Sequence, residues 1–374
     1  MTRWPKETPQ LEGLPRDLGF RMPAEWEPHR ATWIAWPHNL RDWPGKLLPI
    51  PWVYAEIVRH LSRAEDVHIL VNNAALERRA TGVLRRAGAN LSRVKFHQWK
   101  TDRVWTRDSG PIFVKRDRLG SQAERLAITN WKFNAWAKYP DWRHDDQIPA
   151  RVADSLHLPQ CTPTIATPNG PHRVVLEGGS IDVNGQGTLI TTEECLLSEV
   201  QRRNPGVSRQ QLEKVLRDYL GIEQVIWLNR GIVGDDTHGH VDDIARFVGP
   251  NTIVAAVEPN RRDENHLPLE ENLDRLKSAR NLQGRPFRVI ELPMPEPVIF
   301  DRQRLPASYA NFYIANGRVL VPTLNHSVDR KALNILADAF PSREVVGIYC
   351  GDLIWGLGAV HCMTQQQPEA ATES

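Results

Sequence analysis

The sequence has no long hydrophobic run, no cysteine framework and almost no excess of either charge. No apolar stretch approaches the roughly 20 residues that a transmembrane helix needs. The first residues, MTRWPKETPQ, lack the apolar core of a signal peptide. The four cysteines show neither a disulfide-framework nor a C-x-x-C spacing. These absences argue against a secreted or membrane-spanning protein and predict a cytoplasmic one.

The charges nearly cancel, with 47 Lys and Arg against 45 Asp and Glu and a net charge of +2. Such a balance gives no electrostatic reason to expect nucleic acid or a membrane as partner. Of the 374 residues, 41% are hydrophobic and 25% are charged, which is typical of a globular protein. No linker or low-complexity segment divides the chain. We therefore expect a single domain over residues 1–374, with a short frayed tail after about residue 368. The sequence does not fix the oligomeric state, and a homodimer is one state that it allows.

Strand-like runs alternate with amphipathic stretches throughout the chain. The period-3.6 pattern predicts helices near 50–64, 75–88, 146–157, 208–220, 263–281 and 328–339. The segments DVNGQGT and IANGRVL are typical of tight hairpin turns. A helix is followed by a strand and often by a hairpin several times, without a clean sequence repeat. This order predicts an α/β fold of many short sheets rather than one doubly wound sheet.

Four short stretches place reactive side chains beside glycine or at strand ends. They are WTRDSGP (105–111), LEGGS (176–180), DDTHGHVDD (235–243) and GLGAVHCMTQQQP (356–368). Each has an ordinary structural explanation by itself: Asp108 could cap a turn, Glu177 could end a strand, and Cys362 could be a small buried hydrophobe. Their joint occurrence in one chain is what indicates a catalytic site.

The stretch DDTHGHVDD allows two interpretations. His238, His240 and Asp242 alternate, so on an extended chain they would share one face and could bind zinc. The stretch also nearly matches the H-x-H-x-D-H run of metallo-hydrolases, with Asp243 where the last His would stand. A metal-free hydrolytic site is the other interpretation. We favour it, because a zinc site needs further ligands and leaves Cys362 and Glu177 unexplained.

The combination of a thiol, a histidine and several acids suggests a cationic substrate. A thiolate attacks electrophilic carbon while a histidine moves protons. On a strand His361 and Cys362 would point oppositely, so we expect the base within 238–240 and a packing or hydrogen-bonding role for His361. Nearby carboxylates raise the pKa of a thiol and repel its thiolate. A guanidinium substrate would offset this repulsion, because its planar fork binds carboxylates through two hydrogen bonds.

These motifs resemble the bacterial-type peptidylarginine deiminase family and, within it, the agmatine deiminases. The resemblance runs through RMPAEWEPHRATWIAWP, TRDSGPIFV, LEGGSIDVNGQGTLITTEECLL, GDDTHGHVDDIARFV and GLGAVHCMTQQQP, in order and over nearly the whole chain. It implies an α/β fold in the form of a five-bladed, pseudo-symmetric propeller of ββαβ units.

The resemblance also implies roles for particular residues. Cys362 would be the nucleophile and His240 the general acid and base. Asp108 and Asp242 would bind the guanidinium, and Glu177 would contact it and steady the histidine. Two further residues are expected beside the substrate: Trp105 as the flanking aromatic side chain, and His238, which stands where agmatine-specific relatives often have Asp.

The implied reaction is hydrolysis of agmatine to N-carbamoylputrescine and ammonia through a thiouronium on Cys362, with no metal and no cofactor. The expected partner is a small cationic guanidino compound, because an acidic, tryptophan-lined pocket suits a dication. Three alternatives stay open: deimination of arginine or peptidyl-arginine, transfer of the amidine to an amine, and guanidine binding without catalysis.

Overall fold

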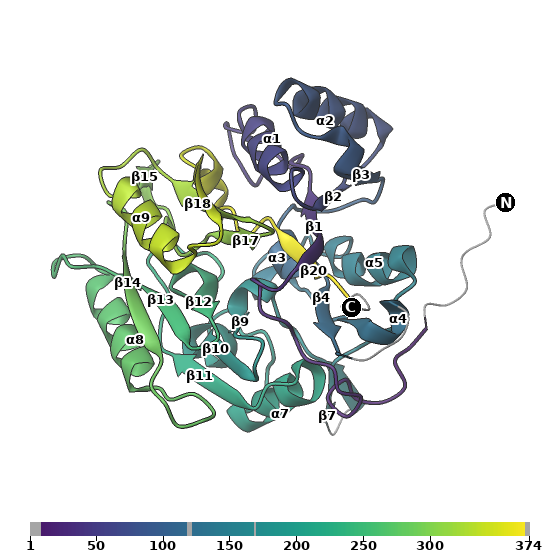
Figure 1. Ribbon diagram of the computed structural model, residues 1–374, viewed down its shortest axis with the longest axis vertical. Helices are drawn as coiled ribbons and strands as arrows, with labels where there is room; N and C mark the ends of the chain where they lie inside the picture. The colour runs from purple at the N-terminus through teal and green to yellow at the C-terminus, as the bar shows by residue number, and fades with distance from the viewer. Residues whose placement is uncertain (1–8, 118–121, 168–169, 371–374) are drawn as a thin grey trace.

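The two ends of the chain meet in one sheet. Strand β20 (Gln365–Pro368) pairs antiparallel with β1 (His29–Ala35), as Figure 1 shows. The computed structural model describes residues 9–117, 122–167 and 170–370. On its other side β1 runs parallel to β2 (Asp66–Leu70), and β2 runs parallel to β3 (Val94–His97). Helices α1 (Ile50–Leu61) and α2 (Ala74–Arg86) make the two connections.

Four further sheets share one order, in which an antiparallel pair of strands is followed by a helical connection and a parallel strand. Their strands are β4 (Ile112–Lys115), β5 (Leu126–Thr129), β6 (Gln160–Cys161); β9 (Asp182–Val183), β10 (Thr188–Thr192), β11 (Gln224–Leu228); β12 (Ala245–Gly249), β13 (Thr252–Val257), β14 (Arg288–Pro293); and β17 (Tyr313–Ala315), β18 (Arg318–Thr323), β19 (Glu344–Tyr349). The connecting helices are α5 (Ile148–Leu156), α6 (Glu193–Leu197) with α7 (Arg209–Leu220), α8 (His266–Ser278) and α9 (Asp329–Ala339).

Smaller elements complete the described chain. They are α3 (Thr106–Ser109), α4 (Gln122–Arg125), the pair β7 (Thr164–Thr167) and β8 (Gly170–Arg173), the pair β15 (Ile299–Phe300) and β16 (Gln303–Arg304), and single-turn 3-10 helices that include η4 (Gly178–Ser180), η5 (Val241–Asp243) and η6 (Leu353–Gly356). The observed mixture of helices and short sheets confirms the predicted α/β class. No helix among the described residues is long and apolar enough to cross a bilayer.

The helices begin and end where the local sequence predicts. In α7, the Ser208 side chain accepts a hydrogen bond from the Gln211 N–H while the Gln211 side chain accepts one from the Ser208 N–H, a reciprocal cap. The helix ends at Gly221, whose φ of 70° lies in the left-handed region that glycine tolerates. All six predicted helices are present, each within three residues of the predicted ends. Both predicted hairpins are also present, as β9–β10 and β17–β18.

Hydrophobic side chains collect in separate buried clusters beneath these sheets. The cluster around β1, β2, α1 and α2 also contains Trp105 and Cys362. The expected nucleophile is thus fixed in the wall of a packed core. Of the predicted frayed tail, Glu369 donates its backbone N–H to Pro28 at 2.8 Å, and residues 371–374 lie outside the described part of the chain.

Candidate active site

Gly179, in the single turn η4, lies where three of the four sequence motifs meet. A side-chain carbon at this position would come within 2.6 Å of His240 Nδ1, 2.8 Å of Asp108 Oδ1 and 3.0 Å of Asp242 Oδ2. The backbone N–H of Gly179 donates to Asp108 Oδ1 at 3.0 Å. Glycine at position 179 therefore lets the backbone lie close to the imidazole and the two carboxylates, because a larger residue would push these side chains apart.

The fourth motif brings Cys362 against the same carboxylates. The Cys362 Sγ lies 3.9 Å from Asp242 Oδ2, and the Asn311 side-chain amide donates to the sulfur at 3.1 Å. Burial, and then the charges of Asp242, Asp243 and Asp108, raise the pKa of the Cys362 thiol well above its ordinary value. The thiol is therefore protonated while the site holds no cation.

Asp108 lies in the short helix α3, with its side chain buried. The indole N–H of Trp136 donates to Asp108 Oδ2 at 2.9 Å. Burial raises the pKa of Asp108 to about 6, helped by the charges of Asp242 and Glu177 and opposed by His240 and the Trp136 hydrogen bond. A turn cap would be solvated, whereas this carboxylate is held inside the protein next to other acids.

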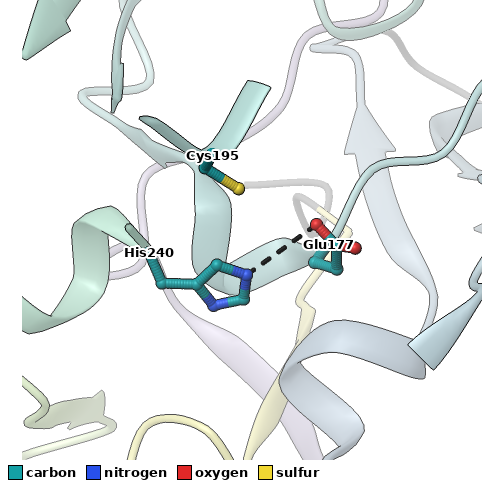
Figure 2. Close-up of side chains that lie close together, drawn as sticks. All are labelled: Glu177, Cys195 and His240. Carbon is teal, nitrogen blue, oxygen red and sulfur yellow. Dashed lines mark ion pairs between the residues drawn. The ribbon is translucent and has the colours of Figure 1, made fainter. Parts of the chain in front are cut away.

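Figure 2 shows His240 facing Glu177, with Cys195 beside them. The His240 Nε2 lies 3.8 Å from Glu177 Oε2, and its Nδ1 lies 3.7 Å from Asp108 Oδ1. Burial opposes a charged imidazole, yet Asp108, Cys195 and Glu177 together raise the pKa of His240 well above its ordinary value. Burial would likewise raise the pKa of Glu177, but Arg203, with its Nε 3.1 Å from Glu177 Oε1, and His240 lower it to about 2. His240 is thus a proton donor in the free site.

The His361 side chain contacts Asp242 and fixes its position. The His361 Nδ1 lies 2.6 Å from Asp242 Oδ2, and its Nε2 lies 2.8 Å from Glu25 Oε2. Glu25 in turn forms ion pairs with Arg246 at 2.9 Å and with Arg107 at 3.1 Å. Burial works against an ionised Asp242, but the hydrogen bond and the charge of His361 lower the pKa of Asp242. His361 is a hydrogen-bonded support of the site, as its position next to Cys362 predicts.

A cavity opens onto Cys362 and Asp108. Trp105 lines it next to the nucleophile: a side-chain carbon on Gly358 would lie 2.7 Å from the Trp105 ring and 3.1 Å from Cys362 Cβ. The other lining residues are Arg41, Asp42, Arg103, Trp136, Tyr139, Asp236, Thr237, Gly356 and Leu357. Flat aromatic walls leading to a thiol among carboxylates suit a slender cation with a planar head.

His238 is not among the residues that line this cavity. Residues 238–242 are not extended, because the Asp235 side chain accepts hydrogen bonds from the N–H groups of Gly239 at 2.7 Å and of His240 at 3.0 Å and folds the segment into a turn. His238 takes a φ of 63°, and its Nε2 lies 3.2 Å from Ser198 Oγ at a separate surface hollow. The expected contact between His238 and the substrate stays a prediction.

The structure adds residues that no motif identified. Trp136 donates a hydrogen bond to Asp108, and Asn311 donates one to Cys362. Arg203 donates one to Glu177. Glu25 lies within the stretch RMPAEWEPHRATWIAWP, but a buried role for it could not be read from that stretch. Trp136 has a φ of 59°, so its approach to Asp108 depends on an unusual backbone conformation that composition does not reveal.

The chain was compared with known proteins. The family model described as Porphyromonas-type peptidyl-arginine deiminase matches residues 21–368. The agmatine deiminase of Pseudomonas syringae pv. tomato is 36% identical over 381 residues, which cover 96% of this chain and 98% of that protein. The solved agmatine deiminase of Enterococcus faecalis is 29% identical with a TM-score of 0.85, covering 97% of this chain and 100% of that one. A solved protein of Porphyromonas gingivalis described as a putative arginine deiminase is 33% identical with a TM-score of 0.82, covering 94% and 99%.

The fold and the site define a hydrolase that acts on carbon–nitrogen bonds of linear amidines. The chain belongs to the Porphyromonas-type peptidyl-arginine deiminase family.

Proposed function

We propose that this protein hydrolyses agmatine to N-carbamoylputrescine and ammonia. The observation that carries the proposal is the position of the buried Cys362 thiol, which opens with Asp108 onto one cavity and contacts Asp242. A thiol in such acidic surroundings is a poor nucleophile for a neutral or anionic substrate, because its ionisation adds a further negative charge. A guanidinium supplies the missing positive charge.

The first half of the reaction forms the covalent intermediate. Asp108 and Asp242 bind the guanidinium, and the Cys362 thiol proton leaves to solvent as the cation arrives. The sulfur then attacks the central carbon, which forms a C–S bond and a tetrahedral adduct. His240 is protonated in the free site and gives its proton to the departing nitrogen. Ammonia leaves, and a thiouronium remains on Cys362.

The second half releases the product. Neutral His240 accepts a proton from a water molecule, and the resulting hydroxide attacks the thiouronium carbon. The C–S bond breaks as the added hydroxyl becomes the ureido carbonyl, its proton passes to the departing Cys362 sulfur and restores the thiol, and the ureido product leaves. Glu177, ionised through Arg203, stabilises the charged form of His240 at both ends of the cycle.

The charges around the cavity favour agmatine over arginine. A carboxylate on the substrate needs a dedicated cationic partner, because desolvating it alone is costly. Among the residues described around the cavity, Arg103 is already bonded to Asp42 at 2.8 Å, and Arg41 lies 3.8 Å from Asp141. Arg103, which also donates to Asp141 at 3.1 Å, is thus not free for the α-carboxylate of arginine, whereas the exposed Arg41 has only this longer contact. The agmatine deiminases among the relatives are consistent with this choice.

A panel of guanidines tests the proposal. The enzyme is incubated with agmatine, arginine or an arginyl peptide, and ammonia and ureido product are both quantified. Equal amounts of both products from agmatine support the proposal. Transfer of the amidine to an added amine, with neither ammonia nor ureido product, would indicate an amidinotransferase. Binding without any product would indicate a guanidine-binding protein.

Three wider features are also proposed. The four sheets of order ββαβ and the four-stranded sheet of β20, β1, β2 and β3 would be the five blades of a propeller in one domain, which the pairing of β20 with β1 would close. The cysteines Cys161, Cys195, Cys350 and Cys362 are free, which suits a cytoplasmic location.

A further inference from the structure

The buried cysteine Cys195 has no part in the proposed reaction, yet it lies beside two residues that do. Cys195 belongs to α6, and Figure 2 shows its sulfur near Glu177 and His240. One ligand atom from each of these three residues lies within 4.8 Å of the other two. The Cys195 backbone N–H donates to the Thr192 side chain at 3.0 Å, which fixes the start of the helix that carries the thiol.

We propose that Cys195, His240 and Glu177 bind a divalent cation of the zinc class, and that the bound ion inhibits the enzyme. The inhibitory part rests on the proposed function, because it depends on His240 and Glu177 serving deimination. The ion is a reversible inhibitor and not a cofactor. It is distinct from the zinc site considered for DDTHGHVDD, since it uses a cysteine from another segment and omits His238 and Asp242.

Unpartnered polar atoms point to a ligand at this place. Glu177 Oε2 and both ring nitrogens of His240 are buried without a hydrogen-bond partner among the described residues. Buried polar groups are normally paired, so atoms left open in this way mark a position where something else binds. A cation next to Cys195 would satisfy Glu177 Oε2 and His240 Nε2 together.

The contacts behind these ligands are those that orient metal ligands in proteins. A metal-bound histidine commonly directs its other ring nitrogen at a carboxylate, and His240 Nδ1 faces Asp108 Oδ1 at 3.7 Å. Arg203 binds Glu177 Oε1 at 3.1 Å, which orients the carboxylate and leaves Oε2 available. Of the three ligands, Glu177 is thus already held by a hydrogen bond, and His240 faces a carboxylate on the side away from Glu177.

The donor set selects the kind of ion. One nitrogen, one sulfur and one oxygen favour zinc or cadmium, whereas calcium and magnesium prefer oxygen alone. The His240 Nε2 to Glu177 Oε2 separation is 3.8 Å, near the roughly 3.3–3.8 Å between ligand atoms of a tetrahedral zinc ion. On binding, the Cys195 thiol and the His240 imidazolium each release a proton to solvent. The thiolate and the carboxylate then balance the charge of the ion.

Substrate and ion exclude one another in this arrangement. Glu177 Oε2 lies 3.8 Å from His240 Nε2. In the proposed reaction Glu177 contacts the guanidinium, and His240 must carry a proton for the leaving ammonia. An ion coordinated by Glu177 and His240 removes both functions and adds positive charge beside a cationic substrate. Inhibition is therefore expected to be competitive with the guanidine.

Cadmium binding to a thiolate gives an ultraviolet charge-transfer absorption, which tests the site without any turnover. The Cys362→Ala variant is titrated with Cd²⁺, and one equivalent is expected to produce the band. The double variant Cys195→Ser/Cys362→Ala should lose it, whereas the matched control Cys161→Ser/Cys362→Ala should keep it. An absent band in Cys362→Ala, or one that survives Cys195→Ser, overturns the site. Thermal unfolding of all variants identifies any that fail to fold.

A second measurement needs no substitution at Cys195. The guanidine that the parent enzyme turns over is added to Cd²⁺-loaded Cys362→Ala protein, and the band should decline as the substrate displaces the ion. A band that depends on Cys195 but does not respond overturns the inhibitory role. If no guanidine is turned over at all, the proposed function fails, while the cadmium titration still decides the site.

In the parent enzyme, added Zn²⁺ should inhibit turnover and a chelator should restore it. The apparent inhibition constant should rise by at least ~10-fold in Cys195→Ser, since loss of a ligand costs more than the roughly 10–100-fold that outer contacts contribute. Unchanged zinc sensitivity in a folded, active Cys195→Ser enzyme would assign the inhibition to Cys362 and contradict the proposal.

Discussion

His361 and Asp242 form a 2.6 Å contact that fixes the inner carboxylate of the site. The other ring nitrogen of His361 lies 2.8 Å from Glu25. Both ring nitrogens of His361 therefore lie within hydrogen-bond distance of a carboxylate oxygen. His361 thus links Asp242 to Glu25 and holds the inner carboxylate in place.

This relationship makes Glu25 and His361 positioning residues. His361→Asn and Glu25→Gln each weaken the contact that holds Asp242, and Glu25→Gln also weakens the pairs with Arg107 and Arg246. Each lost charged hydrogen bond costs about 1.5–3 kcal/mol, so kcat/KM should fall by roughly 10–150-fold or more. The loss should fall mainly on KM, because Asp242 binds the guanidinium. His97→Asn is the matched control, since His97 is buried and hydrogen-bonded to His68 instead. A change in thermal stability with unaltered KM would show that the pair supports only the fold.

Asp108 and Asp242 are predicted to bind the guanidinium directly. Asp108→Asn or Asp242→Asn leaves a buried charge uncompensated, which costs about 3–5 kcal/mol and lowers kcat/KM by a few hundredfold or more. Asp146→Asn, which breaks a partly exposed pair with Arg173, is the control and should change kcat/KM less than about tenfold. Steady-state kinetics on agmatine measures all three, and a loss below tenfold at Asp108 or Asp242 would remove that residue from the site.

The pH dependence should report Asp108. Burial raises the pKa of Asp108 to about 6, so the carboxylate that binds the cation is lost as the pH falls through that value. We expect kcat/KM to drop about tenfold per pH unit below it. Trp136→Phe removes a hydrogen bond that lowers this pKa, so the acid limb should move to higher pH. Trp131→Phe is the control, because the Trp131 indole bonds to Thr129. An acid limb that does not move in Trp136→Phe would assign it to another group.

Much of the fold could be predicted from the sequence because its signals are local. The reciprocal cap at Ser208 and the turn at Asn316–Gly317 each depend on residues a few positions apart. The motif residues Asp108, Glu177 and Cys362 were found for a similar reason, since each stands beside glycine in a short stretch. Their mutual approach could only be inferred from the resemblance.

What the sequence could not supply depends on long-range contacts. Glu25 meets His361 across 336 positions, and Asn311 meets Cys362 across 51. The conformation of residues 235–240 could not be predicted for a different reason: the Asp235 side chain accepts hydrogen bonds from the N–H groups of Gly239 and His240 and closes a turn. Asp side chains can bond to nearby backbone N–H groups in place of the hydrogen bonds of a strand. The alternation of residue types along the sequence does not reveal when this happens.

Discrimination against arginine should depend on Asp42. This buried carboxylate holds Arg103 at 2.8 Å beside the cavity, and its removal would free a cation near the tail of the substrate. Asp42→Ala is expected to lower kcat/KM for agmatine and raise it for arginine, so that their ratio falls at least ~10-fold. Asp66→Ala, which breaks a pair with Arg30 outside the cavity lining, should leave the ratio unchanged. An unaltered ratio in Asp42→Ala would mean that Arg103 does not face the tail.

Cys362 should be essential and act without a metal. Cys362→Ser is expected to fold with an unfolding temperature close to that of the parent and to lose nearly all turnover, because the hydroxyl is far less readily ionised than the thiol. A chelator should leave the metal-free parent enzyme fully active. Inhibition by a chelator that added zinc reverses would contradict this prediction and restore the metal-dependent interpretation.

Covalent deimination through Cys362 is tested most directly by stopping the reaction with acid during turnover of agmatine and weighing the intact protein. The account predicts a species heavier by agmatine less one ammonia, with the added mass on the peptide that contains Cys362, and no such species in Cys362→Ser. Steady production of ammonia from agmatine with no adduct on Cys362 under any quench time would contradict it.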